Sequence, residues 1–287
     1  MVLAMPAHDT STQMTPSISP SLLRHTRVTA TAPLKLAKRS TREEFGLSKD
    51  QADAELAVAK TRIDVLQQRL YAEGRRSVLL VIQAMDAAGK DGTIRNVLAG
   101  LNPAGVNVVS FKAPAGPEAR HDYLWRVHHA CPERGHITVF NRSHYEDVLV
   151  VRVNELAPKA VWRKRFAHIR NFEQQLTDEG TTVVKVFLHV SKNEQARRLQ
   201  ARLDDPEKRW KFRLGDLDDR ALWPKFQRAY EDAINETSTV ACPWYVVPAD
   251  SNSRRNLVVA EILLATLERL DPKIPPPEAG LDGITIV

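Results

Sequence analysis

The chain has 287 residues, with 41 Lys plus Arg against 35 Asp plus Glu, a formal charge of +6 and a pI near 9.4. Its apolar fraction of 43% excludes wholesale disorder, and its two distant cysteines exclude a disulfide framework. No window of about 18 uncharged apolar residues occurs, which excludes a membrane-spanning helix. The positive charge indicates an anionic partner such as nucleic acid, anionic lipid or a phosphate-rich molecule, unless the basic surface has no partner.

Residues 1–34 are expected to form a disordered tail ahead of a catalytic domain at 35–287. The tail is rich in Ser, Thr and Pro, and Asp9 is its only acid. It lacks the apolar core of a signal peptide, although its low acid content loosely resembles an organelle transit peptide. A reduced, cytoplasmic setting is the simplest interpretation.

The first regular pattern is helical and spans Ser48 to about Tyr71, with Gly74 as a stop. Apolar residues recur at spacings of three and four, at Leu56, Ala59, Ile63, Leu66 and Leu70. This helix either packs on its own core or forms a short coiled-coil seam between subunits.

Strands and helices alternate in the rest of the chain. Strands are expected at 77–82, 106–111, 137–140, 183–190 and 245–247. Helices are expected at 91–101, 118–130, 145–156, 160–179, 192–204, 218–238 and 253–270. The continuous apolar run SVLLVI of the first strand is typical of a strand buried on both faces. The alternation predicts an α/β fold, with helices on both faces of a five-stranded parallel sheet.

The first strand runs directly into QAMDAAGKDG at residues 83–92, and a helix follows. Small residues let backbone N–H groups and the helix N-terminus approach an anion, and Lys90 can reach a phosphate oxygen. The segment resembles GxxxxGK[ST], but Ala84 replaces the first Gly and Asp91 replaces the hydroxyl residue. An ordinary strand–helix turn is the alternative. The expected phosphate contacts are Ala87, Ala88, Gly89, Lys90, Asp91 and Gly92.

Asp86 favours the phosphate-loop interpretation. A carboxylate inside the loop would repel a phosphate unless a cation lay between them. We therefore expect Asp86 to hold Mg²⁺ in place of the missing Ser or Thr. Orienting or deprotonating an attacking phosphate is the alternative role.

A second loop, NRSHYED at 141–147, follows the third strand. Open α/β sheets bind ligands at the C-terminal ends of their strands, so Asn141 and Arg142 are expected beside the first loop. Arg142 suits a bidentate phosphate contact, or else a salt bridge at the strand end. Asn141 occupies the place where P-loop enzymes usually present a metal-holding Asp, and Glu146 would restore that carboxylate. His144 is interpreted as a structural residue.

The segment RRLQARLDDPEKRWKFR at 197–213 predicts a cationic lid. Pro206 breaks the helix there, and a cationic break between two helices suits closure over phosphates. A solvated charged face is the alternative, and Trp210 suits either a base contact or core packing. Seven residues carry the positive charge: Arg197, Arg198, Arg202, Lys208, Arg209, Lys211 and Arg213.

Lys112 ends the second strand at the same edge of the sheet. The segment after it carries Glu118, His121 and Asp122. These three residues are candidates for acceptor or metal contacts, or else they form a helix start favoured by the helix dipole.

Five longer motifs occur in a fixed order: AMDAAGKDGTIRNVL, FNRSHYEDVLV, LDDPEKRWKF, GDLDDRALWPKFQRAYEDAINETST and PWYVVPAD. Together they resemble the polyphosphate kinase 2 family, and especially its class III, over residues 35–285. The resemblance implies a P-loop kinase core with a helical basic lid at about 197–217. It also implies reversible transfer of the terminal phosphoryl group of inorganic polyphosphate to AMP or ADP, with Mg²⁺ or Mn²⁺ as cofactor.

The resemblance also assigns residues. It implies catalytic roles for Asp86, Lys90, Arg142 and Arg202. The lid residues Lys208, Arg209 and Lys211 become further polyphosphate contacts. Many members have Asp at the position of Asn141, whereas class III members resemble this chain in having Asn with a nearby Glu. The expected metal set is Asp86, Glu146 and Asp216, and Lys112 and Asn141 are expected to contact phosphate or nucleotide.

Two other functions fit the same residues. One is an ATP-dependent nucleoside monophosphate kinase, and the other is a basic nucleic-acid-binding protein without catalysis. The absence of aromatic residues interleaved with basic strands argues against nucleic acid. The expected partners are polyphosphate, adenine or guanine nucleotides and further copies of the chain in a homo-oligomer, with no nucleic acid and no membrane.

Overall fold

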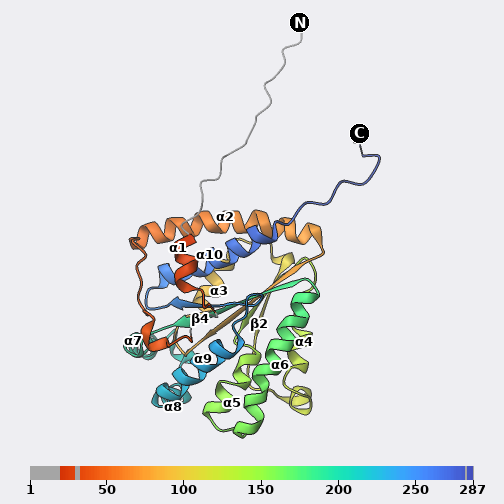
Figure 1. The fold of residues 1–287 in the computed structure, drawn as a ribbon. Coiled ribbons are helices and arrows are strands. Elements are labelled where there is room, and N and C mark those ends of the chain that lie inside the picture. Colours follow the sequence, from red (N-terminus) through yellow and green to blue (C-terminus); the bar gives the residue numbers. More distant parts are fainter. Residues whose placement is uncertain (1–19, 30–32, 282, 287) are drawn as a thin grey trace.

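A computed structural model describes residues 20–29, 33–281 and 283–286 (Figure 1). Its centre is a five-stranded sheet with the order β2-β3-β1-β4-β5, in which every neighbouring pair is parallel. The strands are β1 (Ser77–Ala84), β2 (Val106–Ser110), β3 (Ile137–Asn141), β4 (Thr181–His189) and β5 (Trp244–Pro248). The predicted α/β fold and its five strands are confirmed.

Helices cover both faces of the sheet, because β1, β4 and β5 are apolar on both sides and bury almost every residue (Figure 1). On one face lie α1 (Pro20–Thr26), α2 (Lys49–Glu73), α3 (Lys90–Leu98) and α10 (Asn252–Leu270). On the other face lie α4 (Trp125–His129), α5 (Val150–Val153), α6 (Lys159–Asp178) and α9 (Trp223–Thr237). In the described part of the chain, no helix combines the length and the apolarity needed to cross a bilayer.

Three predicted helices are divided in the structure. Residues 118–130 form a 3-10 turn and the short α4, and residues 145–156 form the turn His144–Asp147 followed by α5. Residues 218–238 are divided between the end of α8 (Gly215–Ala221) and α9, which are separated at Leu222. Pro224 lies in the first turn of α9, where its missing N–H does no harm, so a new helix starts there instead of the old one continuing.

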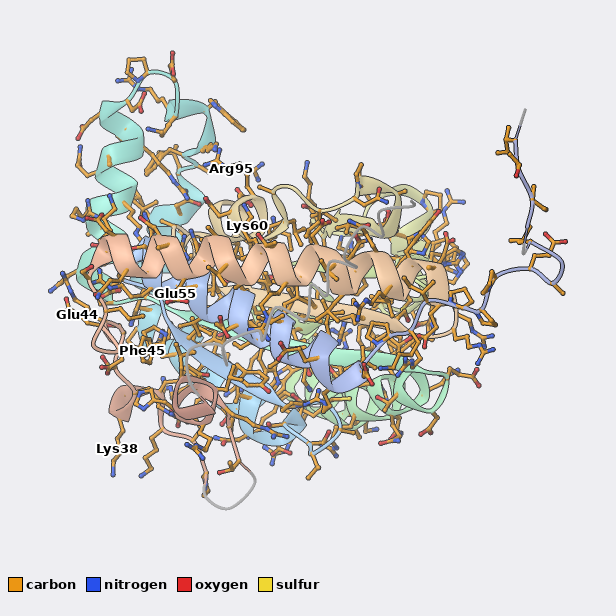
Figure 2. The ribbon with its side chains drawn as sticks, turned by 90° about the horizontal axis from the view of Figure 1, so that it is seen from above. Lys38, Glu44, Phe45, Glu55, Lys60 and Arg95 are labelled. Atoms are coloured by element: carbon orange, nitrogen blue, oxygen red, sulfur yellow. The ribbon has the colours of Figure 1, made fainter. Side chains whose placement is uncertain are left out.

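The long helix α2 begins and ends as its sequence predicts. Ser48 forms a capping box with Gln51, and Gly74 closes the helix in a left-handed conformation. Its buried face packs on α10, and the two helices cross each other in the view from above (Figure 2). Val58 and Val65 remain exposed one heptad apart on the outer face. The residues expected at a seam between subunits, Leu56, Ala59, Ile63 and Leu70, are buried within the chain, so the alternative in which this helix packs on its own core is confirmed. The homo-oligomer stays a prediction.

The predicted disordered tail at 1–34 does not extend over that whole segment. Leu22 of α1 is buried, and Val28 donates its N–H to the Trp244 carbonyl beside β5. Leu34 is also buried, and its N–H donates to Asn235 Oδ1 at 2.7 Å. These apolar residues are too far apart to show a periodicity, yet each of them enters the core. Residues 1–19 and 30–32 lie outside the described residues.

A buried polar cluster ties β4 to the second loop and to α6. Lys185 Nζ lies 2.5 Å from Glu173 Oε2, and both side chains are almost fully buried. Tyr145 donates its hydroxyl to Glu173 Oε1 at 2.7 Å, and Lys185 also donates to the Thr237 carbonyl. Burial disfavours the Glu173 carboxylate, but Lys185 and His144 together outweigh burial and lower the pKa of Glu173. His144 lies in the same cluster, as expected for a structural residue.

Replacing Lys185 with Met should lower the free energy of unfolding by about 3–5 kcal/mol, because Glu173 would become an uncompensated buried charge. The double variant Lys185→Met/Glu173→Leu should lose less. Lys225→Met is the control, because Lys225 is half exposed in its pair with Glu155 and should lose at most about 1 kcal/mol. Urea denaturation measures all three. Equal losses for Lys185→Met and Lys225→Met would contradict the role of the buried pair.

Candidate active site

Two loops meet at the C-terminal edge of the sheet because β1 and β3 are neighbours. Ile82 pairs with Asn141 in the sheet register, and Arg142 donates its N–H to the Ile82 carbonyl at 3.1 Å. The segment after β1, which carries Asp86 and Lys90, therefore lies beside the segment after β3.

The backbone after β1 has the shape of an anion-binding concavity. Ala87 has φ of 58° and Gly89 has φ of 105°, whereas the residue between them does not have a positive φ. Such alternation points successive N–H groups toward one side, and α3 adds its N-terminus at Lys90. Ala87 stores strain in this conformation, which is common at functional loops. Ala84 has no positive φ, so a glycine is not required at the first position of the motif.

Lys90 is folded into the loop. Its side chain is 9% exposed, and Nζ donates to the Ala84 carbonyl at 3.0 Å and to the Met85 carbonyl at 3.4 Å. Burial and the nearby Arg142 lower the pKa of Lys90 to about 8, although Asp86 opposes them. The ammonium thus remains mostly charged at neutral pH and is held where an anion in the loop would meet it.

Arg142 links the two loops through carboxylates. Its Nη2 lies 2.5 Å from Asp86 Oδ1, and its Nη1 lies 3.4 Å from Glu146 Oε2. Its backbone has φ of 62°, a strained conformation for a non-glycine residue. Burial works against the charge of Arg142, but Glu146 and Asp86 more than offset it and raise its pKa.

Positive groups converge on Asp86. Burial disfavours its carboxylate, but Lys90, Arg142 and Arg202 together outweigh burial and lower the pKa of Asp86. A carboxylate with a lowered pKa is a weak base at neutral pH. Asp86 is therefore better suited to binding a positively charged group as an ionised carboxylate than to removing a proton.

Asp219 is a further site residue, which was not predicted from the sequence and which α8 brings against Asp86. Burial and the adjacent Asp86 raise the pKa of Asp219 to about 6. Asp216 lies one turn earlier on α8, 3.9 Å from Arg202 Nη1, and burial and Asp86 also raise its pKa. The spacing of three residues between Asp216 and Asp219 was a usable signal, because it places both carboxylates on one helix face.

The predicted metal set of Asp86, Glu146 and Asp216 is not assembled. Within the described ranges, no three acidic, His or Cys side chains are grouped to hold a metal ion. The Arg142 guanidinium instead pairs with Asp86 through one nitrogen and with Glu146 through the other.

A smaller donor set does fit a divalent cation. Mg²⁺ usually takes one or two protein carboxylates and completes its shell with water and substrate phosphates. Asp86 and Asp219 supply an adjacent pair of carboxylates. Glu146 Oε1 is buried without a hydrogen-bond partner among the described residues, so this oxygen could also serve as a ligand for the cation.

Two of the lid cations lie near the phosphate loop, and others lie farther out. Arg198 donates to the Ala87 and Ala88 carbonyls of the loop. Arg202 on α7 (Lys192–Asp204) acts on Asp86, whereas Lys208 pairs with Asp205 and Arg209 donates to the Leu203 carbonyl. Lys211 lies over the Trp210 ring at 5.1 Å. The side chain of Trp210 is 76% exposed, so the core-packing alternative is wrong. The lid projects from the body at the upper left of Figure 2.

A cavity of about 590 Å³ lies on the β3 side of the loops. Glu118, His121 and Asp122 line it together with Arg126 and Asp147. Arg126 donates to the Lys112 carbonyl at 2.7 Å and pairs with Glu118 at 3.0 Å. Lys112 itself is exposed at the end of β2, two strands away from the phosphate loop.

A parallel sheet, a lysine-bearing loop after the central strand and a basic lid define a P-loop-type protein that binds phosphate groups. A family model described as Polyphosphate kinase 2 (PPK2) matches residues 46–275. The chain belongs to this family, which confirms the resemblance seen in its motifs.

Two relatives and one solved structure illustrate the match. The chain is 58% identical over 242 residues to a Meiothermus ruber protein named AMP/ADP-polyphosphate phosphotransferase, covering 84% of this chain and 91% of that protein. It is 48% identical over 245 residues to an ADP-polyphosphate phosphotransferase of Rhodopseudomonas palustris, with coverages of 81% and 85%. The crystal structure of polyphosphate kinase 2 from Arthrobacter aurescens is 40% identical with a TM-score of 0.87, covering 93% of this chain and 96% of that one.

Replacing Asp219 with Asn should raise the Mg²⁺ concentration for half-maximal phosphoryl transfer by about 10- to 100-fold, the usual effect of losing a charged group around a metal. Thermal stability should not fall, because the change removes repulsion from Asp86. Asp218→Asn is the matched control, since Asp218 is the preceding residue of α8 and is exposed. An Mg²⁺ titration that gives the same midpoint for both variants would show that Asp219 does not contribute to Mg²⁺ binding.

Proposed function

We propose that this protein transfers the terminal phosphoryl group of inorganic polyphosphate to AMP or ADP in a reversible, Mg²⁺-dependent reaction. The observation that carries the proposal is the convergence of Lys90, Arg142 and Arg202 on Asp86 at the end of a phosphate loop. The names of the two relatives described above support polyphosphate as donor and adenine nucleotides as acceptors.

The geometry suits a reaction that needs little covalent help from the protein. Phosphoryl transfer requires in-line positioning and neutralised charge on the transferring oxygens. The N–H groups of the loop and Lys90 would hold the end of the donor chain, and Arg142 and Arg202 would neutralise the transferring group. When bound, Mg²⁺ would be held by Asp86 and Asp219, and it would polarise phosphate oxygens.

No strong general base is required. The terminal phosphate of AMP or ADP is already ionised at neutral pH, so one of its oxygens can attack directly. A new P–O bond forms to the acceptor, the bond to the bridging oxygen breaks, and the shortened polyphosphate leaves with that oxygen. The low pKa of Asp86 agrees with a role that keeps the carboxylate charged.

The acceptor nucleoside is best accommodated by the cavity of about 590 Å³ beside Asp147 and Arg126. Asp147 directly follows Glu146, so this cavity opens next to the second loop. His121 stacks on Trp125 with ring centroids 4.2 Å apart, so aromatic surface is present beside the cavity for a base.

The donor decides between this function and an ATP-dependent nucleoside monophosphate kinase. With ADP and Mg²⁺, ATP should form on addition of polyphosphate and not on addition of a second nucleotide. Lys90→Ala should slow the polyphosphate reaction by about 10²–10³-fold, the usual effect of losing a charge-stabilising group. Its circular dichroism should match that of the wild type. Formation of ATP only with the second nucleotide would refute polyphosphate as donor.

The lid cations should matter more for long donors than for nucleotides. Binding of a polyanion releases counterions, so the affinity for polyphosphate should fall with salt. The variant Arg202→Gln/Lys211→Gln should show a shallower salt slope, with its half-saturation for ADP unchanged. Lys225→Gln on α9 is the control outside the lid. Initial rates against polyphosphate concentration at several salt levels give the slopes, and equal slopes would leave the lid as a solvated charged face.

A further inference from the structure

Side chains from two helices hold three consecutive carbonyls of the phosphate loop. Gln195 Nε2 donates to the Asp86 carbonyl at 3.0 Å. Arg198 Nη1 donates to the Ala87 carbonyl at 3.2 Å and to the Ala88 carbonyl at 2.8 Å. Arg255 Nη1 donates to the same Ala88 carbonyl at 3.0 Å. Gln195 and Arg198 belong to α7, whereas Arg255 comes from α10.

These contacts fix the direction of the neighbouring N–H groups. In a planar trans peptide the C=O and the N–H point to opposite sides. Since the Ala88 carbonyl points at the two guanidinium groups, the Gly89 N–H points away from them. This N–H donates to no backbone acceptor among the described residues, so it is available to an anion.

Arg255 is an unusual group to place behind this loop. It is 2% exposed, and the acceptors that hold its guanidinium among the described residues are all neutral oxygens. Besides the Ala88 carbonyl, these are Asn252 Oδ1 at 2.8 Å and Asn256 Oδ1 at 3.0 Å. Burial and the adjacent Arg198 lower the pKa of Arg255 to about 9, which still leaves it charged at neutral pH.

The guanidinium of Arg255 also lies directly against Gly89. A Cβ on Gly89 would overlap its Nη1 and Cζ atoms, and a Cβ on Gly92 would lie 3.7 Å from its Nη2. A buried charge without an opposite charge is costly to a folded protein. A bound polyanion on the other side of the loop would compensate for that cost.

We propose that Arg255 is a positioning residue for the donor: it holds the Ala88–Gly89 peptide with its N–H toward the polyphosphate end, and its charge attracts that end through the loop. This inference rests on the proposed function, because it takes polyphosphate as the ligand of the loop. Arg255 does not touch the donor itself.

Three variants separate the two parts of this role. Arg255→Met removes both the charge and the hydrogen bonds, and Arg255→Lys keeps the charge but loses the planar fork. Asn256→Asp keeps an acceptor for the fork and adds a neutralising negative charge. Arg254→Met is the matched control, because Arg254 precedes Arg255 on α10 but bonds to the Leu47 carbonyl instead of the loop.

Calorimetric titrations with tripolyphosphate and, separately, with ADP measure the effect on the donor and on the acceptor. Arg255→Met should weaken tripolyphosphate binding by about 10- to 100-fold, which corresponds to the loss of a charged hydrogen bond. Its ADP affinity should be unchanged. Arg255→Lys and Asn256→Asp should each weaken tripolyphosphate binding by less, and Arg254→Met should leave it unchanged.

Equal tripolyphosphate affinity in Arg255→Met and Arg254→Met would overturn the inference. Equal weakening of tripolyphosphate and ADP binding would overturn it too, because that pattern belongs to a general structural role. If Arg255→Met does not fold, wild-type affinity in both Arg255→Lys and Asn256→Asp would overturn it. A wild-type protein that binds no tripolyphosphate would instead refute the proposed function.

Discussion

The phosphate loop can bind a polyanion only if its carbonyl oxygens face away from the ligand. Five consecutive carbonyls, from Ala84 to Ala88, accept hydrogen bonds from cationic or amide side chains. Lys90 takes the first two, and α7 and α10 supply the donors for the other three. The partial negative charge of these carbonyls is thereby directed at the protein. The Gly89 N–H, which donates to no backbone acceptor among the described residues, remains for the ligand. The hydrogen bonds to these carbonyls also hold the backbone of Ala87 in its strained conformation.

The sheet order makes that separation possible. The loop leaves the central strand β1, and the segments after β3, β4 and β5 surround it at the same edge. The second loop after β3 contributes Arg142, α7 after β4 contributes Arg198 and Arg202, and α10 after β5 contributes Arg255. The segments after β1, β3, β4 and β5 therefore all deliver cationic groups to this edge, and Asp86 is the carboxylate on which Lys90, Arg142 and Arg202 act.

Features encoded in short stretches of sequence were predictable. The apolar run of β1, the capping residues of α2 and the Gly-Lys step after β1 all depend on near neighbours. The role of Arg255 depends on a contact across more than 100 residues, so no local pattern shows it. The spacing of Asp216 and Asp219 places both carboxylates on one helix face, but it does not show that Asp86 lies beside them. The helix α1 was missed for a related reason, because Leu22 and Val28 have partners only in the folded core. The exposure of Trp210 could not be predicted either, because the exposure of a side chain depends on the whole fold.

Two departures from the usual P-loop pattern compensate for each other. Asp91 stands where a hydroxyl residue is usual, and Asn141 stands where an Asp is usual. In the structure, Asn141 Nδ2 donates to Asp91 Oδ1 at 2.7 Å. An Asp at position 141 could not donate and would repel Asp91, because an ionised carboxylate only accepts hydrogen bonds. The amide at the end of β3 therefore suits the carboxylate at the start of α3. This contact fastens the second loop to the first, and it leaves the carboxylate of Asp86 free to pair with Arg142.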